Sequence, residues 1–414
     1  MQRITHPPRP DWARRVETEL GFVFHSPDGT VYWDETAHWA FSEAQIDQIE
    51  DAATAFHALA LRAADRAVEQ GRIGELGVPG FAVAAVAESW RRFRDGDMLE
   101  APIYGRLDLA WTGEGPPALL EYNAATPTSL YETSVVQWHW LEDAGPSIQP
   151  GADQFNLLHE ALVEAWRARG DALAGRPVHF TAADVAEDMA TAGYLQAIAT
   201  EAGLATKLVA INDIEFDEAD RRFFDPDGTP IEALFSLYPP EWMLREDWGA
   251  PLIEAIEAGR LVLFEPLWKQ MLSKGILALM HEIAPDHPGL LKAAFQPTAF
   301  GPGEQVVAKP MAGREGDGIE IVTLGPDGMP LPDSVVRQIG AGPRIAGDEG
   351  WVYQAFTPLA PAPGINGGPA GHAVLGVWVI SDKAVALGIR EDAGAITGVA
   401  SRFVPHLFTP AAKD

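Results

Sequence analysis

Apolar residues recur at helical spacing in several stretches of the chain. Ser42 suits a helix N-cap, and apolar positions from Ile46 to Ala60 repeat every three or four residues before Gly71. This pattern predicts a long amphipathic helix over 42–70. The same spacing predicts further helices over 83–94, 130–141 and 153–167.

Alternating polar and apolar residues predict a hairpin near residue 110. The runs 104–111 and 118–123 read as strands, and the Gly- and Pro-rich stretch 112–117 between them reads as a turn. After residue 305 the chain again consists of short apolar runs. Antiparallel strands are expected over 305–309, 319–323, 351–356, 373–380 and 384–390. The Gly- and Pro-rich segment 361–371 is expected to be a loop or hairpin tip.

The middle of the chain predicts a small parallel layer. Strands at 178–181 and 206–210 flank a helix over 187–202, which is a βαβ pattern. Further strands are expected at 231–237 and 261–264. The fold class is therefore α+β, mixed α/β, in three interwoven lobes that span residues 1–150, 151–265 and 266–414.

Composition narrows the classes of protein and partner. The chain has 414 residues, 59 acidic against 30 basic, and no cysteine. The absence of cysteine excludes disulfides, a thiol nucleophile and thiolate metal sites. No apolar run of about 18 residues predicts a spanning helix, and the first residues lack the apolar core of a signal peptide, so a cytoplasmic enzyme is expected. The net charge of −29 argues against nucleic acid or an anionic membrane as partner and is compatible with a cationic substrate.

The predicted hairpin carries a group of oxygen ligands. Asp108 can lie on the same side as Glu121 and Asn123, which are two residues apart. Two carboxylates and a carboxamide suit Mg²⁺. An acidic protein also places such residues at strand ends for structural reasons, so the pattern alone leaves both interpretations open. The cation of Arg106 and the hydroxyls of Thr126 and Thr128 favour a site for a carboxylate beside a phosphate.

A second group of candidate residues lies in the later half of the chain. Lys309 ends a predicted strand and precedes glycines at 313, 316 and 318, a pattern compatible with phosphate binding or with a plain hairpin. Lys274 lies near the start of a predicted helix. The strand at 353–356 could be an edge that offers backbone groups to a planar ring, or an ordinary core strand. Arg390 could stabilise phosphoryl charge or pair with neighbouring acids.

Hydrolase patterns are missing from the sequence. His139 and His159 lie on predicted helices without metal-ligand spacing, and no Gly-x-Ser-x-Gly elbow occurs. The lysine-containing glycine loop matches neither a Walker A motif nor the dinucleotide fingerprint.

These motifs together resemble the synthetase domain of the glutathionylspermidine synthase family, most closely its members without an amidase half. The resemblance covers nearly the whole chain. It is carried by Arg-Leu-Asp-Leu-Ala-Trp at 106–111, Leu-Glu-Tyr-Asn-Ala-Ala-Thr-Pro-Thr-Ser-Leu-Tyr-Glu at 120–132, Asp-Gln-Phe-Asn at 153–156, Tyr-Pro-Pro-Glu-Trp-Met-Leu-Arg-Glu at 238–246, Glu-Pro-Leu-Trp-Lys at 265–269, Lys-Pro-Met-Ala-Gly-Arg-Glu-Gly at 309–316 and Gly-Ile-Arg-Glu-Asp at 388–392. It implies an ATP-grasp fold in a permuted order, because the metal-ligand hairpin precedes the lysines.

The resemblance also implies roles for individual residues. Two Mg²⁺ ions would be held by Asp108, Glu121 and Asn123. The residues expected to bind ATP are Lys274, Lys309, Gly316, Tyr353, Gln354, Ala355 and Phe356. The residues expected to bind the substrates are Arg106, Thr126, Thr128, Glu187 and Asp188, and the catalytic pair would be Arg314 on a lid and Arg390. The segment around Glu187 is only loosely similar to the family pattern, and the amidase domain with its catalytic cysteine has no counterpart here.

The activity that the resemblance implies is an ATP-dependent carbon–nitrogen ligase. The γ-phosphoryl group would pass to a carboxylate, and an amine would attack the acyl-phosphate to form an amide. A glutathione-like peptide or another small carboxylate and a polyamine or other amine are the expected substrates. A nucleotide-binding scaffold or regulatory protein, or a small-molecule kinase, are the alternatives.

Overall fold

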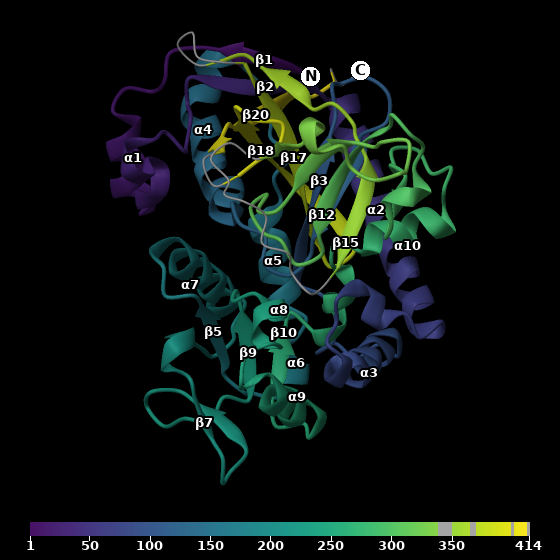
Figure 1. Cartoon of the computed structure of the whole chain (residues 1–414). Helices are drawn as coiled ribbons and strands as arrows, with labels where there is room; N and C mark the ends of the chain where they lie inside the picture. The colour runs from purple at the N-terminus through teal and green to yellow at the C-terminus, as the bar shows by residue number, and fades with distance from the viewer. Residues whose placement is uncertain (338–349, 365–369, 399–400, 412–414) are drawn as a thin grey trace.

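The computed structural model describes residues 1–337, 350–364, 370–398 and 401–411. Figure 1 shows antiparallel sheets in the upper part of the molecule and a smaller layer of strands and helices below them. The predicted mixed α+β class is confirmed. No helix among the described residues has the length and apolarity needed to cross a bilayer.

One antiparallel sheet joins segments from both halves of the chain. The predicted hairpin is formed by β3 (Tyr104–Ala110) and β4 (Ala118–Asn123). β17 (Gly371–Ile380) pairs with β3 on one side and with β18 (Lys383–Asp392) on the other. The short strands β19 (Arg402–Phe403) and β16 (Ala360–Ala362) pair with β18 and β17.

A second antiparallel sheet contains the strands that follow residue 292. Its order is β11 (Ala293–Ala294), β15 (Trp351–Ala355), β12 (Gln305–Pro310), β13 (Glu320–Thr323) and β14 (Val336–Arg337). The prediction that 353–356 could form an open edge is wrong. The two residues of β11 pair with Tyr353 and Gln354, so β15 is an interior strand.

The predicted parallel layer is confirmed. Its order is β10 (Val262–Phe264), β9 (Ala233–Ser236), β5 (Val178–Ala182) and β6 (Thr206–Ala210), and every pairing is parallel. α7 (Ala186–Glu201) connects β5 to β6 and packs with α5 (Leu158–Arg167). A separate ribbon, β7 (Glu215–Asp217) and β8 (Arg222–Phe224), follows β6.

A small three-stranded sheet combines both ends of the described chain. β2 (Ala37–Ser42) pairs antiparallel with β1 (Gln2–Thr5) and parallel with β20 (His406–Thr409). The remaining α-helices are α1 (Trp12–Leu20), α2 (Glu43–Glu69), α3 (Val83–Arg94), α4 (Gln137–Ile148), α6 (Gly170–Leu173), α8 (Pro240–Met243), α9 (Gly249–Glu257) and α10 (Ile276–Ile283).

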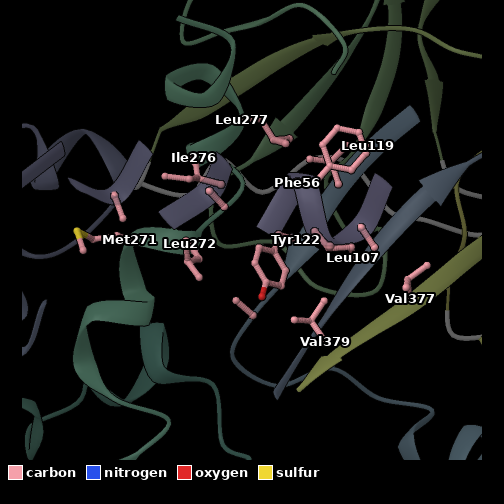
Figure 2. Close-up of a cluster of buried hydrophobic side chains, with 14 of the residues drawn as sticks. Phe56, Leu107, Leu119, Tyr122, Met271, Leu272, Ile276, Leu277, Val377 and Val379 are labelled. Carbon is pink, nitrogen blue, oxygen red and sulfur yellow. The ribbon is translucent and has the colours of Figure 1, made fainter. Parts of the chain in front are cut away.

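The predicted long helix is α2, and its start is fixed by a capping box. The Ser42 hydroxyl accepts a hydrogen bond from the Gln45 backbone, and the Gln45 side chain accepts one from the Ser42 backbone. The buried face of α2 lies against β17, β18 and α10. Figure 2 shows Phe56 of α2 among apolar side chains of the β3–β4–β17 sheet. This core supports the back of that sheet.

Two predicted segments differ in the structure. The helix expected over 153–167 begins only at Leu158, because Asp153 and Asn156 form bridges with Phe408 and Ala386. The loop expected over 361–371 begins later than predicted, since Pro361 lies in β16; its residues 365–369 lie outside the described residues.

Candidate active site

The β3–β4 hairpin separates apolar from charged side chains across the sheet. Leu107 and Tyr122 point into the core behind the sheet (Figure 2). Arg106 and Asp108 flank Leu107 and therefore lie on the opposite face. Both charged side chains are nevertheless buried, at 3% exposure, so this face is covered by other parts of the protein.

A β-bulge in β4 sets the direction of the acidic side chains. Asp108 lies opposite Glu121, but the register shifts at the next position and leaves Leu120 as an extra residue. Leu119 and Tyr122 are three residues apart and both belong to the core. The bulge reconciles this spacing with strand alternation, and it keeps Glu121 on the same face as Asp108.

Two arginines hold the Asp108 carboxylate. Its Oδ1 accepts a hydrogen bond from Arg106 Nε at 2.6 Å, and its Oδ2 accepts from Arg106 Nη2 at 3.0 Å and from Arg390 Nη2 at 2.8 Å. Burial raises the pKa of Asp108, but the charges of the two arginines outweigh it and hold the pKa below its usual value. Arg106 Nη1 also donates to the Thr128 carbonyl at 2.6 Å, which ties the following loop to the site.

Glu121 lies on the wall shared by two cavities. It lines an apolar slot and a larger polar cleft. Its Oε2 lies 3.3 Å from Lys274 Nζ, and Lys274 also donates to the Gly313 carbonyl. Asn123, two residues further along β4, lines the larger cleft. The predicted metal ligands therefore meet the predicted phosphate-binding lysines at one place.

Lys309 is buried behind the same wall, at 4% exposure. Its Nζ donates to the Leu120 carbonyl at 2.6 Å and to Gln354 Oε1 at 2.7 Å. Gln354 is itself held in place, because its Nε2 donates to the Leu119 carbonyl at 2.8 Å. Burial lowers the pKa of Lys309 to about 8, although the negative charge of Glu121 acts to raise it. Two of the three ammonium protons are used within the protein, which leaves one for a ligand.

The apolar slot lies between the two antiparallel sheets and has a volume of about 670 Å³. Its walls are apolar side chains from both sheets and from the segment after β18: Val307, Ile319, Ile321, Phe356, Val374 and Ile396. Its polar end contains Asp108, Glu121 and Lys309. A flat apolar ring with an anionic tail matches this distribution.

The residues predicted to bind ATP divide into two groups. Gly316, Gln354, Ala355 and Phe356 line the slot, but Tyr353 packs in a small cluster on the second sheet. The backbone N–H groups of Ala355 and Phe356 already donate to the Lys292 and Gln305 carbonyls. These two N–H groups are therefore engaged within the protein, and the edge interpretation of this strand fails for a second reason.

The larger cleft has a volume of about 810 Å³ and lies under the glycine loop. Thr126 and Arg314 both line it, and Arg314 Nη2 donates to the Thr126 carbonyl at 3.4 Å. The loop turns back on itself at Gly313, where a Cβ would lie 2.7 Å from Pro310 Cγ and 2.9 Å from the Asp317 carbonyl oxygen. Only glycine allows this turn.

The two acids at the start of α7 lie beside a third cavity. Glu187 lines that cavity together with Glu132. Burial and the nearby charge of Glu132 raise the pKa of Glu187 to about 7. Burial also raises the pKa of Asp188, while the charge of Arg314 opposes that shift. The structure thus brings both predicted acids near the glycine loop.

Two glycines at the site are absent from the sequence-based prediction. Gly376 pairs with Asp108 in β3 and with Gly388 in β18. A Cβ at Gly376 would lie 2.8 Å from Arg106 Cδ, and one at Gly388 would lie 2.6 Å from Thr133 Oγ1. Glycine inside a strand is itself a signal of close approach, and this signal in 373–380 could have identified Gly376.

The possible metal ligands at the hairpin are all oxygen atoms, which suit hard cations such as Mg²⁺. Among the described residues, no group of three or more His, Cys, Asp or Glu could hold a metal ion. Asp108 and Glu121 are direct cross-strand neighbours, with the Asn123 amide two residues along β4. Mg²⁺ typically takes one or two carboxylates and completes its shell with water and phosphate oxygens.

Comparison with known proteins identifies the family. The family described as "Glutathionylspermidine synthase preATP-grasp" matches residues 3–409 of this chain. The chain belongs to this family. The predicted family resemblance is therefore confirmed across almost the whole chain.

The family includes relatives of different lengths. A putative acid–amine ligase of Haemophilus influenzae is 32% identical over 99% of this chain and 100% of that protein. Trypanothione synthetase of Crithidia fasciculata is 28% identical over 76% of this chain and 49% of that protein. Glutathionylspermidine synthase of the same organism is 23% identical, over 94% and 60% respectively. The match thus spans about half the length of the trypanothione synthetase and 60% of the length of the glutathionylspermidine synthase.

A solved structure supports the fold. The glutathione synthetase-like effector GSS30 from Globodera pallida, in its apo form, matches with a TM-score of 0.54 over 97% of this chain and 99% of that chain. At 12% sequence identity this likeness concerns the fold alone. It is consistent with the ATP-grasp prediction.

Proposed function

We propose that this protein is an ATP-dependent ligase that joins a small carboxylate to an amine through an acyl-phosphate. One observation carries the proposal: Glu121 lines both the apolar slot and the polar cleft, where it meets Lys309 on the slot side and Lys274 on the cleft side. Asp108, which also lines the slot, is paired with Arg390. An adenine ring would occupy the slot, and the phosphates would extend to the shared wall. The carboxylate would approach from the cleft.

The basic residues supply charge where phosphoryl transfer needs it. Lys309 has one ammonium proton directed away from its two protein acceptors, and Lys274 is held at the wall by Glu121 and the Gly313 carbonyl. Arg390 lies against Asp108 and would stabilise the transferring phosphoryl group. Transfer of this kind depends on alignment and on preorganised positive charge more than on covalent help from the protein.

The carboxylate and the amine would meet beneath the glycine loop. Arg106, held at the Thr128 carbonyl, and the Thr126 and Thr128 segment would orient the acid, while Arg314 on the loop would cover the acyl-phosphate. The amine nitrogen then attacks the carbonyl carbon, the bond to the phosphate oxygen breaks, inorganic phosphate leaves, and the released proton passes to solvent. Closure of the loop would keep water from the acyl-phosphate.

Asp108, Glu121 and Asn123 would hold Mg²⁺, for which two ions are proposed. When bound, Mg²⁺ would neutralise the charge of the ATP phosphates. In the structure, Arg106 and Arg390 balance the negative charge of Asp108, and Lys274 balances that of Glu121. Bound Mg²⁺ would balance these charges in their place. The permuted order of the ATP-grasp elements and the three lobes 1–150, 151–265 and 266–414 belong to this proposal.

The proposal is tested by crossing a panel of carboxylates with a panel of amines. ADP release is recorded in the presence of ATP and Mg²⁺, and amide products are identified by mass spectrometry. A carboxylate labelled with ¹⁸O is expected to transfer one labelled oxygen to phosphate if an acyl-phosphate forms. ADP release with a phosphorylated substrate and no amide would indicate a kinase, and ATP binding without turnover would indicate a regulatory or scaffold protein.

Glu121→Gln is the appropriate variant for this test. It is expected to abolish ADP formation, whereas Glu114→Gln in the exposed hairpin turn is expected to leave it unchanged. Removal of Asp108 is a poorer choice, because it leaves two buried arginines without their partner and is expected to destabilise the fold by about 3–5 kcal/mol. Normal ADP release by Glu121→Gln would refute the metal role of Glu121.

A further inference from the structure

The third cavity is distinct from the slot and the cleft. It has a volume of about 890 Å³ and lies between the 20–24 segment, the π-helical turn Glu132–Val136 and the first turns of α7. Most of its wall is apolar or aromatic: Leu20, Phe22, Val23, Phe24, Tyr131 and Tyr194. Val23 is 72% exposed, which is unusual for a valine and places an apolar side chain at the open side of this cavity.

The two tyrosines line the cavity with their rings, because their hydroxyls are hydrogen-bonded to other groups of the protein. Tyr131 donates its hydroxyl to the Leu20 carbonyl at 2.5 Å. The Tyr194 hydroxyl lies 2.6 Å from Ser134 Oγ and 3.0 Å from His159 Nδ1. The rings meet edge to face with centroids 5.0 Å apart. A ligand therefore meets aromatic surface at these positions and finds no free hydroxyl.

Polar recognition in the cavity is concentrated in two carboxyl groups. Glu132 is only 5% exposed and accepts a hydrogen bond from the Tyr32 hydroxyl at 2.5 Å. Burial raises the pKa of Glu132, and burial together with the charge of Glu132 raises that of Glu187. Two carboxylates that repel each other in a poorly solvated place are stabilised by a cation between them.

The acidic part of the cavity lies toward the reaction site. The charges of Arg106 and Arg390 act on Glu132, and the charge of Glu315 on the glycine loop acts on Glu187. Tyr32, which holds Glu132, also lies 3.1 Å from Ser129 Oγ, one residue after the loop carbonyl that binds Arg106. A cation held by Glu132 and Glu187 would thus be close to where an acyl-phosphate forms.

We propose that this cavity binds the amine substrate, and that this substrate is a single ammonium group on an apolar or aromatic body and not a polyamine. The inference rests on the proposed ligase function. A polyamine carries a charge every few carbons, and each charge buried without a partner is unfavourable. Among the described residues that line the cavity, Glu132 and Glu187 are the only charged ones, and apart from Thr191 the rest of the wall suits hydrocarbon.

Binding of defined amines to the whole protein tests the inference. Phenethylamine, spermidine and the uncharged 2-phenylethanol are titrated by calorimetry, with and without Mg²⁺ and a non-hydrolysable ATP analogue. Phenethylamine is expected to bind about tenfold more tightly than either of the other two. Ala190→Trp, which fills the cavity, is expected to weaken phenethylamine binding about tenfold or more, and Ala197→Trp, two turns further along α7, is the matched control.

The outcomes separate this inference from the ligase proposal. Tighter binding of spermidine, absence of phenethylamine binding under both conditions, or unchanged binding to Ala190→Trp would overturn the cavity assignment. Amide formation with hydrophilic amines alone would do the same while leaving the ligase intact. Phenethylamine binding that is lost in Ala190→Trp, without any amide from any acid, would support the cavity and refute the ligase.

Discussion

Under the proposed function, the buried ammonium of Lys309 is expected to make ATP binding dependent on pH. Its pKa is lowered to about 8 because the side chain is buried. Two of its protons are donated to the Leu120 carbonyl and to Gln354, so the third direction is the one available to a phosphate. When Lys309 loses a proton, this direction holds a lone pair that repels the phosphate oxygen. ATP is therefore expected to bind the form with Lys309 protonated, and its affinity is expected to fall as the pH rises through 8.

The size of the effect follows from the titration. With a pKa of about 8, the protonated fraction of Lys309 falls from about nine tenths at pH 7 to about one tenth at pH 9. The Kd for ATP is then expected to rise about tenfold over this range, which corresponds to about 1.4 kcal/mol. The terminal phosphate of ATP is already ionised at pH 7 and adds little to this change.

Fluorescence titration with an ATP analogue at pH 7, 8 and 9 measures the effect. The Lys309→Arg variant keeps its charge throughout this range, so its Kd is expected to change little between pH 7 and pH 9 whatever its absolute value. A wild-type Kd that is constant over this range would refute the role of Lys309 as a protonated phosphate ligand. A pH dependence equal in the two proteins would assign the titration to another group.

Three further perturbations test other parts of the structure. Gly376→Ala places a Cβ 2.8 Å from Arg106 Cδ and is expected to destabilise the protein by about 1–3 kcal/mol; an unchanged denaturation midpoint would contradict the packing described here. Ser42→Ala removes the cap of α2 and is expected to lower stability by about 1 kcal/mol and to speed hydrogen exchange at Gln45. The pKa of Glu187 is raised to about 7 in the folded protein. Between its pKa in the unfolded chain and pH 7, ionisation of this carboxyl group therefore increasingly favours the unfolded state. Glu187→Gln is therefore expected to raise Tm at pH 8 and to change it little near pH 4.5, and an equal shift at both values would argue against this.

Local sequence signals predicted the elements that carry the site. The β3–β4 hairpin follows from alternation around a Gly- and Pro-rich turn, and α2 follows from its cap and its periodicity. The βαβ pattern of the middle segment likewise predicted the parallel layer. In each case the relevant contacts lie close together in sequence, where residue spacing determines them.

Contacts between distant segments could not be predicted in this way. The sequence alone does not specify that β17 pairs with β3, or that two residues of β11 cover β15. The π-helical turn and the cavity between the 20–24 segment and α7 depend on packing of three separate regions. The position of Tyr353 outside the slot could not be predicted either. Strand alternation shows that neighbouring residues lie on opposite faces of the sheet, but it does not show which face lines the slot.

The extra residue at Leu120 marks a position at which this hairpin can change in length during evolution. Loss of Leu120 would remove the bulge and restore regular alternation, in which Leu119 and Tyr122 still face the core and Glu121 still lies opposite Asp108. Insertions in the exposed part of the turn, 114–116, would leave the strand register unchanged. Homologous sequences that retain activity are therefore expected to vary in length within the turn and at the bulge, and to keep a constant spacing from Glu121 to Asn123.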